Sequence, residues 1–177
     1  MYQSLTNGDV SNFDTTSVTR MDGMFNGASS FNQDVSKFDT SSVTDMYGMF
    51  SRASLFNGDV SSFNTSSVTD MTAMFLGASS FNQNVSNFDT SSVNDMTSMF
   101  EYARSFNGDL SSFDLSSVTD MAMMFYNATS FNKDLCSWQD SFPYTANTAD
   151  IFTNSGCAYQ DAPNATQKGP FCASNCQ

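Results

Sequence analysis

The sequence predicts an α/β repeat solenoid of about six coils, in which each coil carries one short strand and one short helix. The main observation is a unit that recurs every 25 residues without gaps; the copy 81–105 reads FNQNVSNFDTSSVNDMTSMFEYARS. The second observation is that each unit holds two apolar series, one with strand-like alternation and one with helical spacing. Because every unit runs in the same direction, the strands are expected to be parallel.

The chain divides into a repeat region and a C-terminal cap. Copies of the unit begin at residues 6, 31, 56, 81, 106 and 131, so the solenoid is expected over residues 1–155. Residues 156–177 depart from the unit and contain two prolines and three cysteines, which predicts an irregular cap. A chain of 177 residues is long enough for one domain with a continuous core.

The strand is expected where Val85, Phe88 and Thr90 lie in the representative copy. Phe88 and Thr90 alternate with polar residues, which suits a short strand with these two side chains turned inward. A strand this short is not stable alone, so each coil needs a neighbour on either side.

The helix is expected where Met96, Met99, Phe100 and Ala103 follow the i, i+3, i+4, i+7 spacing of one helical face. Ser92 and Asp95 fit the Ser-x-x-acid pattern that caps a helix N-terminus. The methionine columns lie at core spacing beside phenylalanines, so we interpret them as packing residues and not as a soft-metal site.

Identical residues in successive copies predict columns that run from coil to coil. The core is expected from columns of Phe, Val and Met, led by Phe38, Phe63, Phe88 and Phe113. A second column is expected to be a ladder of asparagines whose amides bond the backbone of neighbouring turns. Its members are Asn7, Asn32, Asn57, Asn82, Asn107 and Asn132.

Composition excludes several classes of partner. The net charge of −12 argues against nucleic acid and against anionic membrane surfaces. No apolar run is long enough to span a membrane. Much of the charge repeats, as at Asp34, Asp39 and Asp45, and these aspartates are interpreted as solvated turn and cap residues. Cation binding on the Asp ladders stays an alternative, although no copy has the dense pattern of a calcium loop.

The four cysteines all lie near the C-terminus, outside the regular copies. An even, clustered count predicts two disulfides that staple the cap, and hence an oxidising compartment, extracellular or at the cell surface. Zinc is the alternative and would need all four thiolates, since the chain has no histidine. Three pairings remain open among Cys136, Cys157, Cys172 and Cys176.

Two sets of surface residues are candidate sites. Apolar residues at variable outward positions mark a candidate contact face, namely Leu76, Tyr102, Met123 and Tyr126. Four Asn-x-Ser/Thr sequons are candidates for N-glycosylation in an exported eukaryotic protein, with Asn127 and Asn164 preferred. The sequons begin at Asn64, Asn84, Asn127 and Asn164.

The phrase FN-x-D-[V/L]-S-x-[F/W]-D-T-S-S-V-T-D-M-x-x-M-F-x-x-A closely resembles the bacterial surface protein repeat. That repeat also occurs in mycoplasma lipoproteins, belongs to a domain of unknown function and is related to BspA-like leucine-rich repeats. The resemblance covers residues 6–155, and the cysteine-rich ending is similar to that of secreted members from microalgae. It implies a leucine-rich-repeat-like solenoid, usually extracellular, with no assigned catalysis.

These observations favour a non-catalytic extracellular protein for structure or interaction, with no cofactor. An enzyme is not expected, because the aspartates repeat evenly and no phosphate-binding glycine loop is present. Ice binding is an alternative, since Thr and Ser recur at coil spacing. The hydroxyl columns are Thr15, Thr40, Thr65 and Thr90, and Ser17, Ser42, Ser67, Ser92 and Ser117.

The N-terminal end has no recognisable cap. The first copy has Thr6 where Phe is expected and Arg20 where Asp is expected. Two interpretations stay open: the chain lacks its first residues, or another molecule covers this end. In the second case the partner is another protein or a second copy that associates end to end into a filament.

Overall fold

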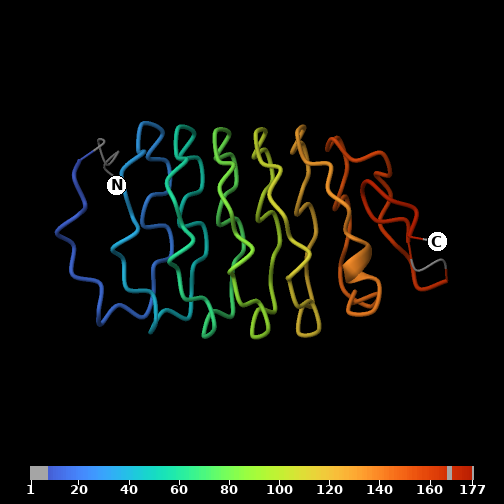
Figure 1. Ribbon diagram of the computed structural model, residues 1–177, viewed down its shortest axis with the longest axis horizontal. Helices are drawn as coiled ribbons and strands as arrows, with labels where there is room; N and C mark the ends of the chain where they lie inside the picture. The colour runs from blue at the N-terminus through green and yellow to red at the C-terminus, as the bar shows by residue number, and fades with distance from the viewer. Residues whose placement is uncertain (1–7, 167–168, 177) are drawn as a thin grey trace.

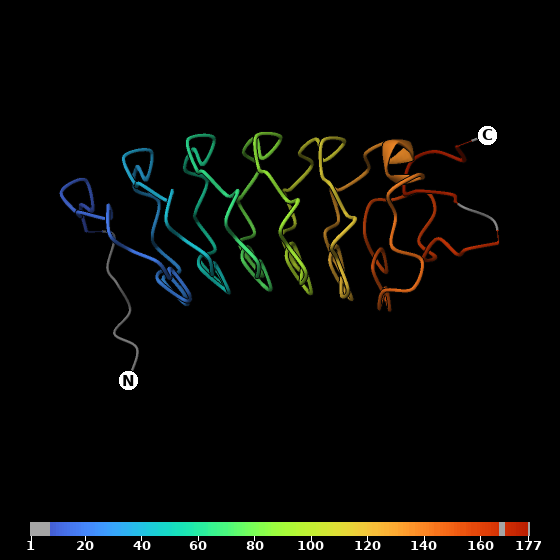
Figure 2. The same ribbon diagram turned by 90° about the horizontal axis from the view of Figure 1, so that it is seen from below.

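Each repeat forms one coil, and successive coils lie side by side along the long axis of the molecule (Figure 1). The structure is a computed structural model that describes residues 8–166 and 169–176. Seen at right angles, each coil is a flattened loop with a tight bend at either end (Figure 2). The chain therefore passes from one end of the stack to the other without crossing it.

The predicted strand and helix of each coil are wrong. Within the described residues the only regular element is η1, a 3-10 helix at Cys136–Trp138 in the last coil. Across residues 8–166 and 169–176 no strand forms, and pairing is confined to isolated bridges. The molecule is a stack of turns, and the α/β architecture expected from the sequence does not form.

Turns explain why the spacing resembled a helix. The amide of Met99 donates to the Met96 carbonyl at 3.1 Å, and that of Ala103 donates to the Phe100 carbonyl at 3.0 Å. Each bond closes a β-turn whose first and fourth residues face the core. Two turns placed end to end give the same i, i+3, i+4, i+7 burial as a helical face. The same geometry recurs in turn 85–88, so no strand forms at Val85 either.

The coils are joined through the segment in which a helix was expected. Alternate amides donate to carbonyls of the next coil at 2.8–2.9 Å, namely those of Met96, Ser98, Phe100 and Tyr102. Parallel bridges accompany this ladder in every coil, through Arg20, Asp45, Asp70, Asp95, Asp120 and Asn147. The ladder has a direction: the amides of each coil donate to carbonyls of the following coil, the one nearer the C-terminal end of the stack.

The turns require left-handed backbone at two positions in each coil. One column contains Gly48 and Ser98, with φ of +56° at each; the other contains Gly77 and Tyr102, with φ of +66° and +56°. These are the third residues of turns that need positive φ there, and glycine adopts it without steric cost. Non-glycine members of both columns therefore hold a disfavoured conformation.

We expect Ser98→Gly to raise the free energy of unfolding by up to about 1 kcal/mol, because glycine removes the left-handed strain. The matched variant Gly48→Ala in the same column should lower it by about 1–2 kcal/mol. A Cβ at Gly48 would lie 3.6 Å from that of Ser51, so a steric clash does not contribute. Urea denaturation measures both changes; a destabilising Ser98→Gly would contradict this backbone geometry.

Phenylalanine fills the centre of the stack. Within each coil two rings stack, as Phe75 does on Phe81 at 3.9 Å between centroids, and each ring meets its equivalents in the coils on either side at 5.4–5.9 Å. The column predicted to lead the core is also buried, at 2–4% exposure: Phe38, Phe63, Phe88 and Phe113. In the last coil Trp138, on η1, takes this column's place and donates its Nε1–H to the Leu110 carbonyl at 2.9 Å.

Candidate functional site

Most repeated polar residues bond the coil's own backbone. Asp34, Asp39 and Asp45 each accept, through Oδ1, the amide of the residue two positions on, at 2.8–2.9 Å. This Asx geometry fixes the start of a turn. The predicted capping residue Asp95 does the same for Thr97, so it caps a turn and not a helix.

Hydrogen bonds of this kind also lower the pKa values of several of the aspartate side chains that accept them. The hydroxyl and the amide of Ser91 hold the pKa of Asp89 below its ordinary value, and those of Ser41 do the same for Asp39. One coil on, the amide and hydroxyl of Ser116 lower the pKa of Asp114, although the charge of Asp89 opposes them. At Asp114 these hydrogen bonds therefore outweigh both burial and the charge of Asp89, each of which acts to raise its pKa.

The free energy of unfolding is expected to change little between about pH 7 and 5 and to fall as the pH drops below about 4. Stability falls on acidification because these aspartate pKa values are lower in the folded chain than in the unfolded chain. The unfolded chain therefore binds protons more readily, and acid favours it. Asp89→Asn should keep the fold at pH 7 and make this loss shallower, since Asn64 accepts the same two bonds from Ser66. Thermal melts across this range measure it; a Tm that rises on acidification would mean that inter-coil repulsion dominates.

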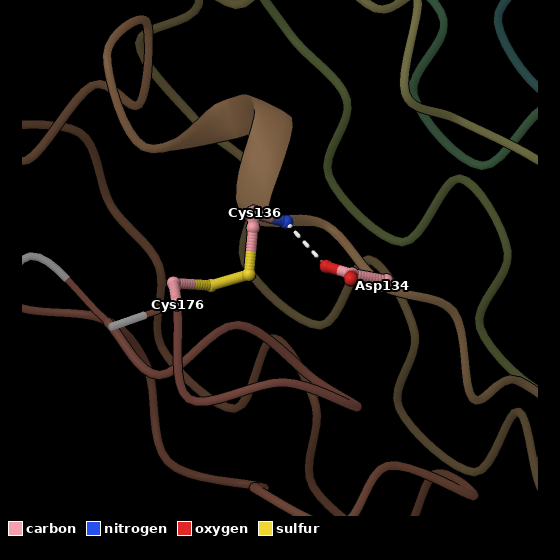
Figure 3. Close-up of side chains that lie close together, drawn as sticks. All are labelled: Asp134, Cys136 and Cys176. Atoms are coloured by element: carbon pink, nitrogen blue, oxygen red, sulfur yellow. Dashed lines mark hydrogen bonds between the residues drawn. A yellow bond between two sulfur atoms is a disulfide. The ribbon is translucent and has the colours of Figure 1, made fainter.

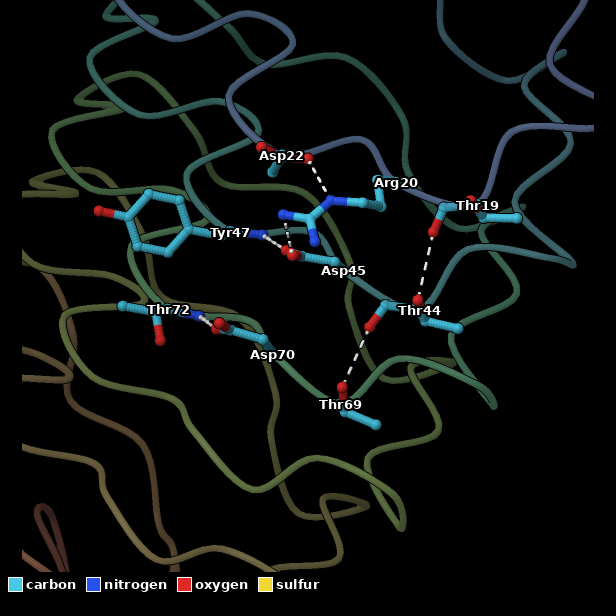
Figure 4. Close-up of polar contacts among 9 residues, drawn as sticks. All are labelled: Thr19, Arg20, Asp22, Thr44, Asp45, Tyr47, Thr69, Asp70 and Thr72. Carbon is cyan, nitrogen blue, oxygen red and sulfur yellow. Dashed lines mark hydrogen bonds and ion pairs between the residues drawn. The ribbon is translucent and has the colours of Figure 1, made fainter.

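One aspartate column lies on the backbone ladder, and Figure 4 shows the end of it at which Arg20 lies beside Asp45. Arg20 contacts Asp22 at 3.0 Å and Asp45 at 2.8 Å, and the hydrogen bond and charge of Asp22, followed by the charge of Asp45, raise its pKa. At the other end of the column, the side-chain amide of Asn147 donates to the Asp120 carboxylate at 2.9 Å. The substitution of Arg for Asp in the first copy thus compensates the column's charge.

Asparagines link successive coils at one edge of the stack. Each side-chain Oδ1 accepts the backbone amide of the asparagine 25 residues on, at 2.8–3.1 Å. The acceptors are Asn32, Asn57, Asn82 and Asn107. Asn7 lies outside the described residues. These four side-chain oxygens are therefore occupied, and they hold the backbone of the next coil in place.

The threonine column considered for ice binding is buried. Thr15, Thr40, Thr65 and Thr90 are 1–5% exposed. The Thr40 hydroxyl donates to the Asn64 carbonyl at 3.0 Å and accepts a hydrogen bond from the Asn64 backbone amide at 2.8 Å. The hydroxyl therefore links two coils in the way that a pair of backbone hydrogen bonds would. These hydroxyls do not face solvent, whereas the serines of the second column are exposed.

Two disulfides hold the C-terminal region: Cys136 to Cys176 and Cys157 to Cys172. The Asp134 carboxylate lies beside the first of them and accepts the Cys136 amide at 2.9 Å (Figure 3). Asp134, Cys136 and Cys176 are close enough to suggest metal ligands. Because their sulfurs are bonded to each other and no cysteine is free, thiolate ligation is ruled out here.

The sequon asparagines lie at the surface. Asn64, Asn84 and Asn164 are exposed and Asn127 is half-buried. In the three exposed sequons the asparagine Oδ1 accepts the amide of the third sequon residue at 2.9–3.1 Å. Glycosylation at these positions stays a prediction.

The variable residues gather around a hollow of about 490 Å³ on the edge of the ladder segment. It is lined by Arg52, Leu76, Gly77, Glu101 and Tyr102. Of the predicted contact face, Leu76 and Tyr102 lie here, and Tyr126 supports Tyr102 edge-on at 5.8 Å between ring centroids. Met123 is exposed but does not line the hollow.

Sequence reasoning missed Arg52, Gly77 and Glu101 because it selected apolar residues only. A signal was present in one column, where residues 25 positions apart alternate between glycine and a large side chain: Gly27, Arg52, Gly77 and Tyr102. A glycine between two large neighbours in a stacked column leaves a notch.

Stacked coils of turns with an internal polar framework and a variable edge define a repeat protein. The chain belongs to the family described as Mycoplasma protein of unknown function, DUF285, whose model matches residues 1–75 and 59–164. The predicted resemblance is thereby confirmed at family level. No curated protein and no solved structure matches the chain. Within the described residues, no helix has the length and apolar character needed to cross a membrane.

Proposed function

We propose that this chain is a non-catalytic extracellular repeat protein that presents a binding surface on a rigid stack of coils. The observation that carries the proposal is that some residue columns hold the backbone together while other positions vary from coil to coil. Side chains of repeated Asp, Asn and Thr residues bond backbone, whereas those of Arg52, Glu101 and Tyr102 at the ladder edge make no such bond within the described residues. Binding to a partner requires a surface that differs from coil to coil.

The chemistry of the described residues favours binding over catalysis. The carboxylates Asp39, Asp89 and Asp114 have lowered pKa values and already accept turn hydrogen bonds, so they are poor general acids and bases near neutral pH. All four cysteines are oxidised and do not serve as nucleophiles. The family is one of unknown function.

Two disulfides in a chain of this size support an oxidising compartment. We place the protein outside the cell or at its surface, in keeping with the resemblance of its ending to secreted proteins. In a eukaryotic source, N-glycans are proposed at the exposed Asn64, Asn84 and Asn164.

Fractionation of the source cells, followed by mass spectrometry of the unreduced protein, tests this placement. The expected result is protein in the medium or released from intact cells by protease, with both disulfides formed and, in a eukaryote, added glycan mass. Protein found only inside cells with four free thiols would contradict the proposal.

End-to-end association is a second proposal, carried by the direction of the ladder. Carbonyls of the first described coil, such as those of Asp22 and Met24, receive no inter-coil bond from the described residues. Phe13 is 47% exposed, whereas its equivalents one and two coils on, Phe38 and Phe63, are 3–4% exposed. A second copy that donates backbone amides to these carbonyls would also cover Phe13.

Sedimentation velocity over an about hundredfold concentration range measures this association. We expect the sedimentation coefficient to rise with concentration and Phe13→Asp to abolish the rise. Tyr47→Asp, at a residue that is equally exposed but lies one coil further on, is the matched control. A monomer at every concentration would overturn this second proposal and leave the scaffold role intact.

A further inference from the structure

The hollow at the ladder edge exists because one side chain is missing from a column. Arg52, Gly77 and Tyr102 occupy equivalent positions in three successive coils, and all three have left-handed backbone, with φ of 59°, 66° and 56°. Gly77 places no side chain between the arginine and the tyrosine, and a Cβ there would lie 3.7 Å from the Cγ of Arg52. Leu76 and Glu101 complete the lining.

The two charged groups at the hollow are not used by the fold. Both ion pairs in residues 8–166 and 169–176 belong to Arg20, so Arg52 and Glu101 lie beyond ion-pair distance of each other. Tyr102 is 39% exposed and its ring is held by the edge of Tyr126. The hollow thus combines donors, acceptors and a supported aromatic wall.

We propose that this hollow binds a neutral hexopyranose unit of a glycan. Sugar hydroxyls both donate and accept, so one ring can accept hydrogen bonds from Arg52 and donate to Glu101. The C–H face of a pyranose is apolar and suits the Tyr102 ring and Leu76. The hollow is open on one side, and its volume of about 490 Å³ leaves room for one such ring.

The charge of the chain disfavours acidic glycans. The chain carries a net charge of −12, which repels polyanions such as uronate or sulfated glycans at a distance. One arginine beside one glutamate adds no local positive excess. The inference rests on the proposed binding role and specifies its ligand; failure to bind sugar would leave the scaffold role standing.

Titration of the ¹⁵N-labelled protein with a neutral linear glucose trisaccharide, a mannose trisaccharide and a galacturonate trisaccharide tests the assignment. A neutral sugar should shift the amide signals of Gly77, Glu101 and Tyr102 in a saturable way. Arg52→Ala and Tyr102→Ala should each lower the affinity about tenfold or more. Arg104→Ala and Tyr47→Ala, which remove an exposed arginine and tyrosine outside the hollow, should leave it unchanged.

Three outcomes would overturn the proposal. The first is the absence of saturable shifts with either neutral trisaccharide. The second is stronger binding of the galacturonate, which would make the ligand class acidic. The third is binding that Arg52→Ala and Tyr102→Ala weaken no more than the two controls. Unfolded variants are recognised by loss of the dispersed amide spectrum, and Arg52→Met and Tyr102→Leu, which keep an aliphatic side chain but remove the donor or the ring, then replace them.

Discussion

Replacement of Phe75 by alanine is expected to lower the free energy of unfolding by about 3–5 kcal/mol, the range for large-to-small changes in packed cores. Phe75 is fully buried. Its ring lies 3.9 Å from that of Phe81 within the coil, and 5.6 and 5.5 Å from those of Phe50 and Phe100 in the adjacent coils. The substitution leaves a cavity in the middle of the stack, where coils on both sides limit collapse.

Phe13→Ala is the matched control, because its ring is 47% exposed and, among the described residues, has one ring neighbour, Phe38, at 6.5 Å. We expect it to cost less than about 1 kcal/mol. Phe88→Ala, in the third buried column, should resemble Phe75→Ala. Denaturant melts in which Phe75→Ala and Phe13→Ala lower the free energy of unfolding by equally small amounts would contradict the stacked core.

Removal of the bond between Cys136 and Cys176 by the double substitution to alanine should destabilise the C-terminal end by about 4 kcal/mol. The estimate follows from the entropy of closing a loop, here with a sequence separation of 40. Since each coil contacts only its neighbours, the loss should be local, and the coils at 31–105 should keep their structure. Limited proteolysis should cut after residue 136 first.

The Cys157–Cys172 bond, with a sequence separation of 15, provides the comparison. Its removal is expected to cost about 3 kcal/mol by the same relation. Hydrogen exchange would locate both effects, with faster exchange in residues 136–176 than at Phe75. Equal acceleration along the whole stack would show that the molecule unfolds as one unit and that the disulfides do not act locally.

The sequence predicted the period and the buried columns because these depend only on which residues recur. Side chains at equivalent positions must stack whatever backbone carries them, so Phe63, Phe88 and Phe113 are buried together. The number of disulfides followed from the cysteine count, but their pairing depends on the path of the cap, which no local pattern encodes.

The secondary structure was not predictable from apolar spacing. Met96, Met99, Phe100 and Ala103 satisfy a helical face and two consecutive turns equally well. What decides between them is the left-handed backbone at Ser98 and Tyr102, and a helix has no such residues. Glycines at equivalent positions, Gly48 and Gly77, were the available signal, since helix interiors disfavour glycine.

The candidate site was predicted only in part for a related reason. The search for apolar residues at outward positions found Leu76 and Tyr102. The hollow itself, however, forms because Gly77 has no side chain to fill it. Its charged members, Arg52 and Glu101, come from the coils on either side of the one that holds Gly77, and they line the same hollow because coils stack at one register. That register follows from the ladder and not from the composition of any single repeat.

Hydrogen-bond scalar couplings measured by NMR test the central claim, a stack of turns joined by a directional ladder. The Phe75 amide should couple to the Met99 carbonyl, from which it is separated by 2.9 Å in the next coil, and the Met74 amide should couple to Met71. A coupling from the Phe75 amide to the carbonyl of Met71, four residues earlier, would instead indicate a helix and would contradict the structure described.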